Sequence, residues 1–204
     1  MANRSILSAP PLVAIAGWLL PGAGYFLIGQ TARAVVVGAA VLTMFVAGIL
    51  IAGIRVIDVP GYDNLGFEVR LRSAAMVQAP GQYAGQKLDW TDPGFYQGDR
   101  ALTSRPLAEI VNKPWYVGQV LTGPVCLLAS KLSLHAAQPA DIQAARASRV
   151  PPQPGVAASH ARVAEIGSLY TAIAGMLNLL AIIDAASRAS GEEESTGRAK
   201  AATA

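Results

Sequence analysis

The sequence predicts an all-α integral membrane protein with about four transmembrane helices and a small extramembrane insertion between helices two and three. Hydrophobic residues make up 52% of the 204-residue chain. Charged residues make up 14%, against roughly 25% in ordinary soluble domains. Between Ser5 and Ile54 the only ionisable side chains are Tyr25 and Arg33. This run is long enough for two bilayer crossings of about 20 residues each, and further apolar stretches follow later in the chain.

Apolar and polar stretches alternate along the chain and divide it into segments. Two apolar stretches form an N-terminal hairpin, a polar insertion rich in turn residues follows, and two further apolar stretches flank an Ala- and Pro-rich loop. The expected boundaries are the N-terminal transmembrane hairpin at 1–57 with spans at about 11–28 and 34–57, the insertion at 58–113, the third span at 114–134, the loop at 135–162, the fourth span at 163–186 and a disordered tail at 187–204.

The first span contains a helix break. Pro21 lies inside it, with Gly22 and Gly24 directly after it. Proline removes a backbone donor and clashes with the preceding turn, so the helix should kink or end near Leu20. Two structures fit, a kinked span or a half-helix followed by a turn and a second short helix. Broken backbone at membrane depth needs protein or water partners, so we expect Pro21, Gly22, Gly24 and Gly29 to pack among helices.

The fourth span carries small and polar residues with helical spacing. Ser168, Thr171, Gly175 and Asn178 follow an i, i+3, i+7, i+10 pattern, which places them on one helix stripe. Small residues allow close helix contact, and an Asn side chain can form a hydrogen bond to a neighbouring helix. We therefore expect this stripe to face another helix. Asp184 lies off the stripe near the end of the span, where it can reach water.

The third apolar stretch is less regular than the others. Trp115 and Tyr116 stand at its start, where interfacial aromatic residues usually lie. Gly118, Gly123 and Pro124 interrupt it. Because its apolar part is only about sixteen residues long, a short, tilted or partly re-entrant span is expected. Within the preceding insertion, alternating apolar and charged residues predict a short strand at 67–72.

No group of residues in the sequence predicts catalysis, a cofactor or a metal site. Cys126 is the only cysteine, which excludes an intramolecular disulfide and a cysteine-based metal cluster. His135 and His160 flank the loop without a spacing that would pair them as haem ligands. The sixteen Lys and Arg form no run, so nucleic acid is not an expected partner. The expected partners are the lipid bilayer and other proteins of a membrane complex.

The N-terminus allows a second interpretation, a cleaved signal peptide with Arg4 in its charged region and Leu12 to Leu20 as its apolar core. However, the apolar pattern resumes at once after Gly24, and no A-x-A cleavage arrangement is present. We therefore expect a multi-pass integral membrane protein. With four spans, the excess of Lys and Arg puts the N-terminus, the insertion and the C-terminal tail on the cytoplasmic side.

The motif from Trp18 to Gly29, WLLPGAGYFLIG, is followed by a second span. It resembles a hairpin of uncharacterised bacterial multi-span membrane proteins that carry a domain of unknown function. It is distantly similar to the two-transmembrane-helix hairpin domain, whose motif also ends in an aromatic–leucine–x–glycine element, although the His-Arg pair of that domain is missing. The segment at 169–185 resembles the last span of the same uncharacterised proteins. The resemblance implies a multi-pass protein of the bacterial inner membrane and no established activity.

These observations lead to a principal hypothesis and two others. The principal hypothesis is an integral membrane protein without a catalytic site, serving as an accessory or structural subunit of a larger membrane assembly. The alternative is a small transporter or channel that uses the broken first helix and Asp184. Four spans are few for a transporter, and the sequence has no internal repeat. A membrane enzyme would need paired acids, a metal cluster or an activated nucleophile, and the sequence offers none of these sets.

Overall fold

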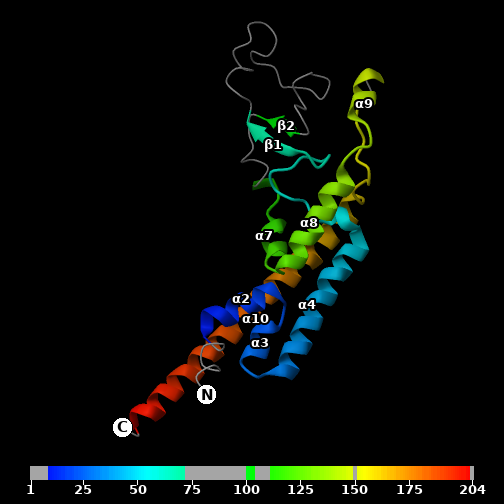
Figure 1. Cartoon of the computed structure of the whole chain (residues 1–204). Helices are drawn as coiled ribbons and strands as arrows, with labels where there is room; N and C mark the ends of the chain where they lie inside the picture. Colours follow the sequence, from blue (N-terminus) through cyan, green and yellow to red (C-terminus); the bar gives the residue numbers. More distant parts are fainter. Residues whose placement is uncertain (1–8, 72–99, 104–110, 149–150, 203–204) are drawn as a thin grey trace.

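The computed structural model describes residues 9–71, 100–103, 111–148 and 151–202, and these residues are mostly helical. Two long helices form the frame of the molecule (Figure 1). They are α4, Thr31–Ala52, and α10, Ala161–Ala202. They run antiparallel in close contact, with Gly48 of α4 against Gly167 of α10.

Among the described residues, two helical segments are long and apolar enough to cross a membrane, rather than the four that were expected. They are Thr31–Ala52 and, within α10, Ala161–Gly191. At 1.5 Å per residue, the 22 residues of α4 extend about 33 Å, close to the roughly 30 Å of a bilayer core. The other two expected spans each divide into two shorter helices.

The segment expected as the first span, 11–28, forms a hairpin. Its helices are α2, Pro10–Leu19, and α3, Ala23–Leu27, and they run antiparallel, with Gly24 packed against the backbone of Val13. Of the two structures that the sequence left open, the chain adopts the half-helix, turn and second short helix. We call this element the N-terminal hairpin. Because α2 has only 10 residues, it extends about 15 Å, half of a bilayer core.

The segment expected as the third span, 114–134, forms a second hairpin, here called the central hairpin. It consists of α7, Trp115–Val120, and α8, Pro124–Ala137. The Ser130 hydroxyl donates to the Tyr116 hydroxyl at 3.2 Å, as expected for antiparallel helices. The two hairpins approach from opposite ends of α10, and their tips meet near the middle of the molecule (Figure 1).

Beyond the end of α4, a 3₁₀ helix, η1, Ile54–Val56, leads into the insertion. Two strands, β1, Glu68–Leu71, and β2, Arg100–Thr103, then pair in parallel, with Glu68 opposite Arg100. The described part of the strand predicted at 67–72 is therefore found. The short helix α9, Ile142–Ser148, lies beyond the same end of the long helices (Figure 1). The insertion and the loop before α10 thus share one end of the molecule.

The C-terminal segment corrects one expectation. The tail at 187–204 was expected to be disordered, but α10 continues as a helix to Ala202. The tail is rich in Ala, Glu, Lys and Arg, which are good helix formers. A helix that is already formed extends without a new nucleation step, so these residues can simply continue it.

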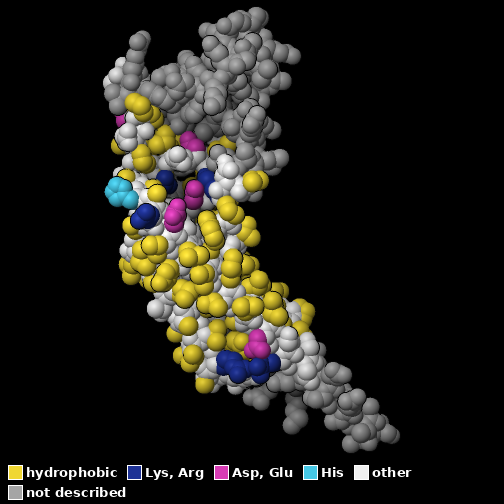
Figure 2. Space-filling view, turned by 180° about the vertical axis from the view of Figure 1, so that it is seen from behind, with side chains coloured by type: hydrophobic (Ala, Val, Ile, Leu, Met, Phe, Trp, Pro, Cys, Tyr) yellow, Lys and Arg dark blue, Asp and Glu magenta, His cyan; other side chains and the backbone are white. Residues whose placement is uncertain are grey.

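The buried core has two parts, one for each hairpin. Phe45 of α4 and Cys126 of α8 are fully buried in the part next to the insertion. Val13 of α2 and Ala185 of α10 belong to the part at the other end. Outside this core, hydrophobic side chains form a broad surface band between two groups of charged side chains (Figure 2).

Candidate functional site at the junction of the two hairpins

The break in the N-terminal hairpin leaves a backbone carbonyl without its helical partner. Leu20 precedes Pro21 and is extended, with φ −142° and ψ 119°, because a residue before proline avoids helical geometry. In a continuous helix, the carbonyl of Gly17 would accept the N–H of residue 21. Pro21 has no N–H, so the Gly17 carbonyl must be satisfied from elsewhere.

The central hairpin has a comparable break. Its turn runs from Leu121 to Gly123, where Gly123 has φ +91°, and Pro124 then begins α8. The turn prevents the carbonyl of Leu121 from accepting the N–H of residue 125, its partner in a continuous helix. A carbonyl at each tip therefore needs a donor from another part of the chain.

Asn178 of α10 supplies the donor to both tips. Its side-chain Nδ2 donates to the carbonyl of Gly17 at 3.2 Å and to the carbonyl of Leu121 at 2.9 Å. The side chain is completely buried. One carboxamide thus joins two helix breaks that lie about a hundred residues apart in the sequence.

The two tips also contact each other directly. The indole Nε1 of Trp18 donates to the carbonyl of Val120 at 3.2 Å. A Cβ placed on Gly123 would lie 1.9 Å from the carbonyl oxygen of Trp18, so only glycine allows this approach. The hairpins are therefore packed backbone to backbone at the junction.

A second buried amide lies on the side of the junction toward the insertion. Nε2 of Gln119, in α7, donates to Thr171 Oγ1 of α10 at 2.8 Å and to the carbonyl of Val56 at 3.3 Å. Gln119 is 1% exposed and Thr171 is fully buried. The amide therefore links α7, α10 and η1 in one place.

Several buried polar atoms at the junction have no hydrogen-bond partner within the described part of the chain. They are Gln119 Oε1, Asn178 Oδ1 and the hydroxyl oxygen of Thr122. The crevice beside Asn178, lined by small residues such as Gly17 and Ala181, is too narrow for a water molecule. The junction therefore keeps two buried amide oxygens and one buried hydroxyl without a described partner.

Asp184 lies at the end of the span away from the insertion. Its Oδ2 accepts hydrogen bonds from the Tyr25 hydroxyl at 2.8 Å and from Arg188 Nε at 2.9 Å. Nη1 of Arg33 is 3.8 Å from the same oxygen. The Asp184 side chain is 44% exposed, so it lies at the border of the hydrophobic band and is not enclosed within it.

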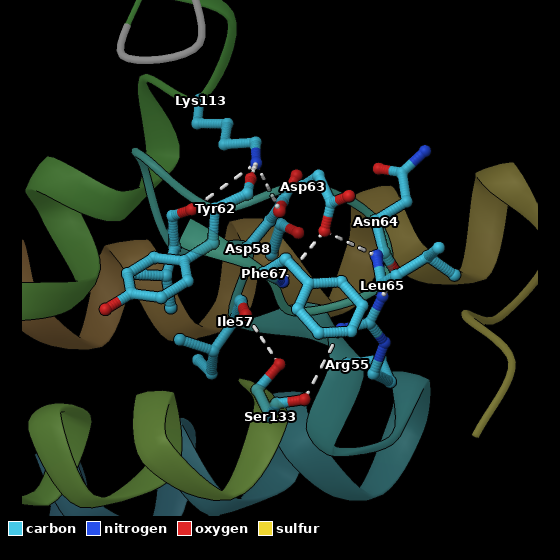
Figure 3. Close-up of polar contacts among 12 residues, drawn as sticks. Arg55, Ile57, Asp58, Tyr62, Asp63, Asn64, Leu65, Phe67, Lys113 and Ser133 are labelled. Carbon is cyan, nitrogen blue, oxygen red and sulfur yellow. Dashed lines mark hydrogen bonds and ion pairs between the residues drawn. The ribbon is translucent and has the colours of Figure 1, made fainter. Parts of the chain in front are cut away.

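A cluster of charged residues lies at the opposite border, at the base of the insertion (Figure 3). The Lys113 side chain is 8% exposed, and its Nζ lies 3.0 Å from Asp58 Oδ1. The same Nζ donates to the carbonyls of Tyr62 at 2.7 Å and Val59 at 3.3 Å. Because Asp58 and Lys113 stand at the two ends of the insertion, their ion pair closes its base.

Arg55 attaches this base to the central hairpin. Its Nη1 donates to the carbonyl of Ser133 at 3.3 Å, and the Ser133 hydroxyl donates to the carbonyl of Ile57 at 2.8 Å (Figure 3). Burial lowers the pKa of the Arg55 guanidinium, while the nearby carboxylates of Asp58 and Asp63 act in the opposite direction. Arginine keeps its charge in proteins, so the contact stays charge-assisted.

The residues predicted at the helix break have different surroundings. Pro21 and Gly22 are buried against α4, and a Cβ on Gly22 would lie 2.2 Å from the carbonyl oxygen of Ala34. Gly24 packs against α2. Gly29, which was expected to pack among helices, is exposed and ends α3, with nothing within 4 Å of a Cβ at this position.

The predicted stripe on α10 faces the rest of the molecule. Thr171 and Asn178 form the contacts described above, and a Cβ on Gly175 would lie 1.9 Å from the carbonyl oxygen of Gly118 in α7. The Ser168 hydroxyl donates to the carbonyl of Val56 at 3.4 Å. The stripe is thus the surface on which the central hairpin and η1 pack.

Sequence reasoning did not single out Gln119 or Lys113, although both were visible as polar residues in or beside an apolar stretch. Gln119 is the one amide side chain between Pro114 and Leu134, and this isolation could have indicated a buried partner. Among the described residues, no group of three or more His, Cys, Asp or Glu side chains comes together as a metal site would require.

Comparison with protein families adds one finding. A family model described as a family of unknown function (DUF6677) matches residues 12–197. The chain belongs to this family. The expected membership in a family of unknown function is therefore confirmed. No curated protein and no solved structure matches the chain.

The DUF6677 match contains the whole junction. It begins inside α2 and ends inside α10, so both hairpins and the residues that join them lie within the part of the chain that defines the family. The base of the insertion, with Asp58 and Lys113, lies within it as well.

Proposed function

We propose that this member of DUF6677 is an integral membrane protein without a catalytic site. It crosses the bilayer twice, inserts two hairpins from opposite sides, and serves as a structural subunit that holds its insertion on one side of the membrane for a partner protein. The observation that carries the proposal is the double hydrogen bond of Asn178 to Gly17 and Leu121. The carbonyls freed by both helix breaks are used by the chain itself and are closed to a substrate.

The shape of the apolar surface supports the membrane location. The exposed side chains of α4 include Val35, Val36 and Leu50, with exposed fractions of 59%, 68% and 79%. A soluble protein rarely exposes large continuous apolar surfaces, whereas lipid covers them without cost. Figure 2 shows the band between two groups of charged side chains, one toward each end of the molecule.

The same geometry supports a structural role over the transporter alternative. Broken helices in transporters leave backbone groups open to the substrate or ion at mid-membrane. Here Asn178 and Trp18 occupy carbonyls at the two tips, and the crevice beside them is too narrow for water. Asp184 has three partners at the border of the band, which is a poor position for an ion path through it.

The contacts at the base of the insertion suggest where a partner binds. The Asp58–Lys113 ion pair closes the base of the insertion, and Arg55 donates to the carbonyl of Asn64 in the insertion and to that of Ser133 in the central hairpin. A partner that binds the insertion would therefore be linked through these contacts to the helices, as expected for a subunit of an assembly.

We also infer that the insertion end faces the cytoplasm. The orientation expected from the sequence also placed the insertion on the cytoplasmic side, but it assumed four crossings, which would put both termini on that side and separate the insertion from the loop before α10. With two crossings, both lie at one end, and positive charge is richer there, as the positive-inside rule requires of the cytoplasmic side. Among the Lys and Arg whose side chains the structure describes, two lie at the end of the molecule that carries the termini, Arg33 and Arg188. Six lie at the insertion end: Arg55, Arg70, Arg100, Lys113, Lys131 and Arg162.

Labelling of single cysteines tests the two-span topology in intact cells or sealed vesicles. Cysteines at the exposed positions Asn112, Gln153 and Ser190, each in a Cys126→Ala background, should divide into two groups. We expect Asn112 and Gln153 to react from one side and Ser190 from the other. A four-span protein would put Asn112 on the side of Ser190, and this result would contradict the proposed topology.

Co-purification tests the structural role. The tagged full-length chain is crosslinked in membranes, extracted in a mild detergent and compared with a chain in which residues 72–99 are replaced by a Gly-Ser linker. A partner held through the insertion should be recovered with the first chain and lost with the second. A lone chain in both preparations, together with ion or solute flux in liposomes that Asp184→Asn abolishes, would instead favour the transporter.

A further inference from the structure

At the end of the molecule away from the insertion, two arginines from different helices share one carboxylate. Arg188 Nε donates to Asp184 Oδ2 at 2.9 Å, and Arg33 Nη1 lies 3.8 Å from the same oxygen. Arg33 Nη1 also donates to Gln30 Oε1 at 3.1 Å, and its guanidinium lies 5.8 Å from the centre of the Tyr25 ring. We call Arg33, Arg188 and Asp184 the arginine pair with its shared acid.

The arginine pair has more charge and more donors than its shared acid can satisfy. Two guanidinium groups and one carboxylate leave a net charge of +1. Each guanidinium has five N–H donors, and the described contacts use only a few of them. The side chains of Arg33 and Arg188 are 45% and 42% exposed, so the remaining donors face the surroundings.

The position of the pair determines what can reach it. Arg33 lies in the first turn of α4, just before the exposed Val35 and Val36. Arg188 follows the exposed Ile183 on α10. Figure 2 shows Lys or Arg side chains beside an Asp or Glu side chain at one border of the hydrophobic band, with apolar side chains directly adjacent. A molecule bound here would meet cations at one end and an apolar surface at the other.

We propose that the arginine pair is a binding site for the phosphate headgroup of an anionic phospholipid. A guanidinium matches phosphate oxygens with two parallel N–H donors, and a second guanidinium from another helix fixes the headgroup from the side. The acyl chains of the same lipid would lie along the apolar band. This inference rests on the proposed membrane location, but it does not depend on the role of the insertion or on any protein partner.

Native mass spectrometry of the full-length protein tests the site. The protein in a neutral detergent is mixed with equal amounts of phosphatidylglycerol and phosphatidylcholine, and the ratio of bound lipids is measured on the monodisperse fraction. The wild-type chain should retain phosphatidylglycerol preferentially. The double variant Arg33→Gln, Arg188→Gln should lose this preference by about 10-fold or more, because charge-assisted hydrogen bonds are lost.

Two matched variants distinguish a binding site from a structural ion pair. Asp184→Asn removes the competing carboxylate and raises the local charge to +2, so phosphatidylglycerol should bind more tightly, whereas a purely structural role predicts no gain. Lys131→Gln with Arg162→Gln removes two exposed cations at the insertion end and should leave the preference unchanged. Equal retention of the two lipids by the wild type, or an unchanged preference in the arginine variant, would overturn the proposal.

A soluble phosphate is the competing occupant. Glycerol 3-phosphate offered at the same concentration of phosphate groups should not displace the bound lipid, because it lacks acyl chains for the apolar band. If it displaced the lipid at equal concentration, the site would be one for soluble phosphate and the lipid assignment would be wrong. Membrane extraction of the chain, measured separately, reports on the membrane location alone, so failure of that premise is recognised independently.

Discussion

The double hydrogen bond of Asn178 is the contact whose loss should have the largest effect on the membrane part of the protein. Asn178→Leu keeps the approximate volume of the side chain and removes both donors. The carbonyls of Gly17 and Leu121 would then lie buried without a partner, because Pro21 supplies no N–H to the first and the turn before Pro124 withholds the N–H of residue 125 from the second. The variant therefore isolates the polar contribution of one side chain to both hairpins.

The expected cost follows from the two bonds. Hydrogen bonds between membrane helices contribute about 0.6 kcal/mol on average and up to about 1.7 kcal/mol, so two of them contribute about 1–3 kcal/mol. A buried carbonyl left without a donor costs about 1–3 kcal/mol, which the hairpins can reduce by moving apart. We expect Asn178→Leu to lower the free energy of unfolding by about 2–4 kcal/mol.

The assay is equilibrium unfolding in detergent micelles, followed by steric trapping or by helical circular dichroism during titration with a denaturing detergent. A double-mutant cycle with Pro21→Ala makes the test specific. Alanine at position 21 restores an N–H that can reach the Gly17 carbonyl once Leu20 becomes helical, so Asn178→Leu should cost about 1 kcal/mol less in that background. A cost below about 0.5 kcal/mol in the wild-type background, or no coupling to position 21, would refute the reasoning.

Two further predictions concern packing and the base of the insertion. Gly175→Ala should destabilise the protein by about 1–3 kcal/mol or more in the same unfolding assay, because the added Cβ would lie 1.9 Å from the Gly118 carbonyl oxygen. The control variant Gly191→Ala should be neutral or stabilising, because nothing lies within 4 Å of a Cβ at that position. Equal effects would contradict the close approach of α7 and α10. Lys113→Met should weaken the insertion base by about 2 kcal/mol and raise hydrogen exchange there roughly 30-fold, while exposed Lys131→Met should not. Unchanged exchange in Lys113→Met would show that the described contacts of Lys113 are not needed.

Local rules explain what the sequence could predict about the helix breaks. Proline removes an N–H and restricts the preceding residue wherever it occurs, so a break at Leu20 follows from Pro21 alone. The helical spacing of Thr171, Gly175 and Asn178 likewise places them on one face without knowledge of the neighbouring helix. The existence of α4 follows from an unbroken apolar run of bilayer length.

The number of crossings could not be predicted in the same way. A hydropathy average measures how apolar a segment is, but it is nearly the same for a kinked span and for a hairpin of two half-helices. The direction after each break depends on what packs at the tip. Gly22 and Gly123 allow the reversal, and contacts with α4, with Trp18 and with α10 select it. These contacts join residues that are far apart in the chain.

The sequence by itself determined the apolar composition of this protein, its two long helices, the break at Pro21 and the polar stripe on the last helix, because each depends on residues within a few turns of one another. Only the tertiary structure decided that both shorter apolar segments reverse direction, that the insertion shares an end with the loop before α10, and that Asn178 joins the two breaks. The physical reason is that a freed carbonyl requires a donor but does not specify its origin, and here the donor to Gly17 lies 161 residues away.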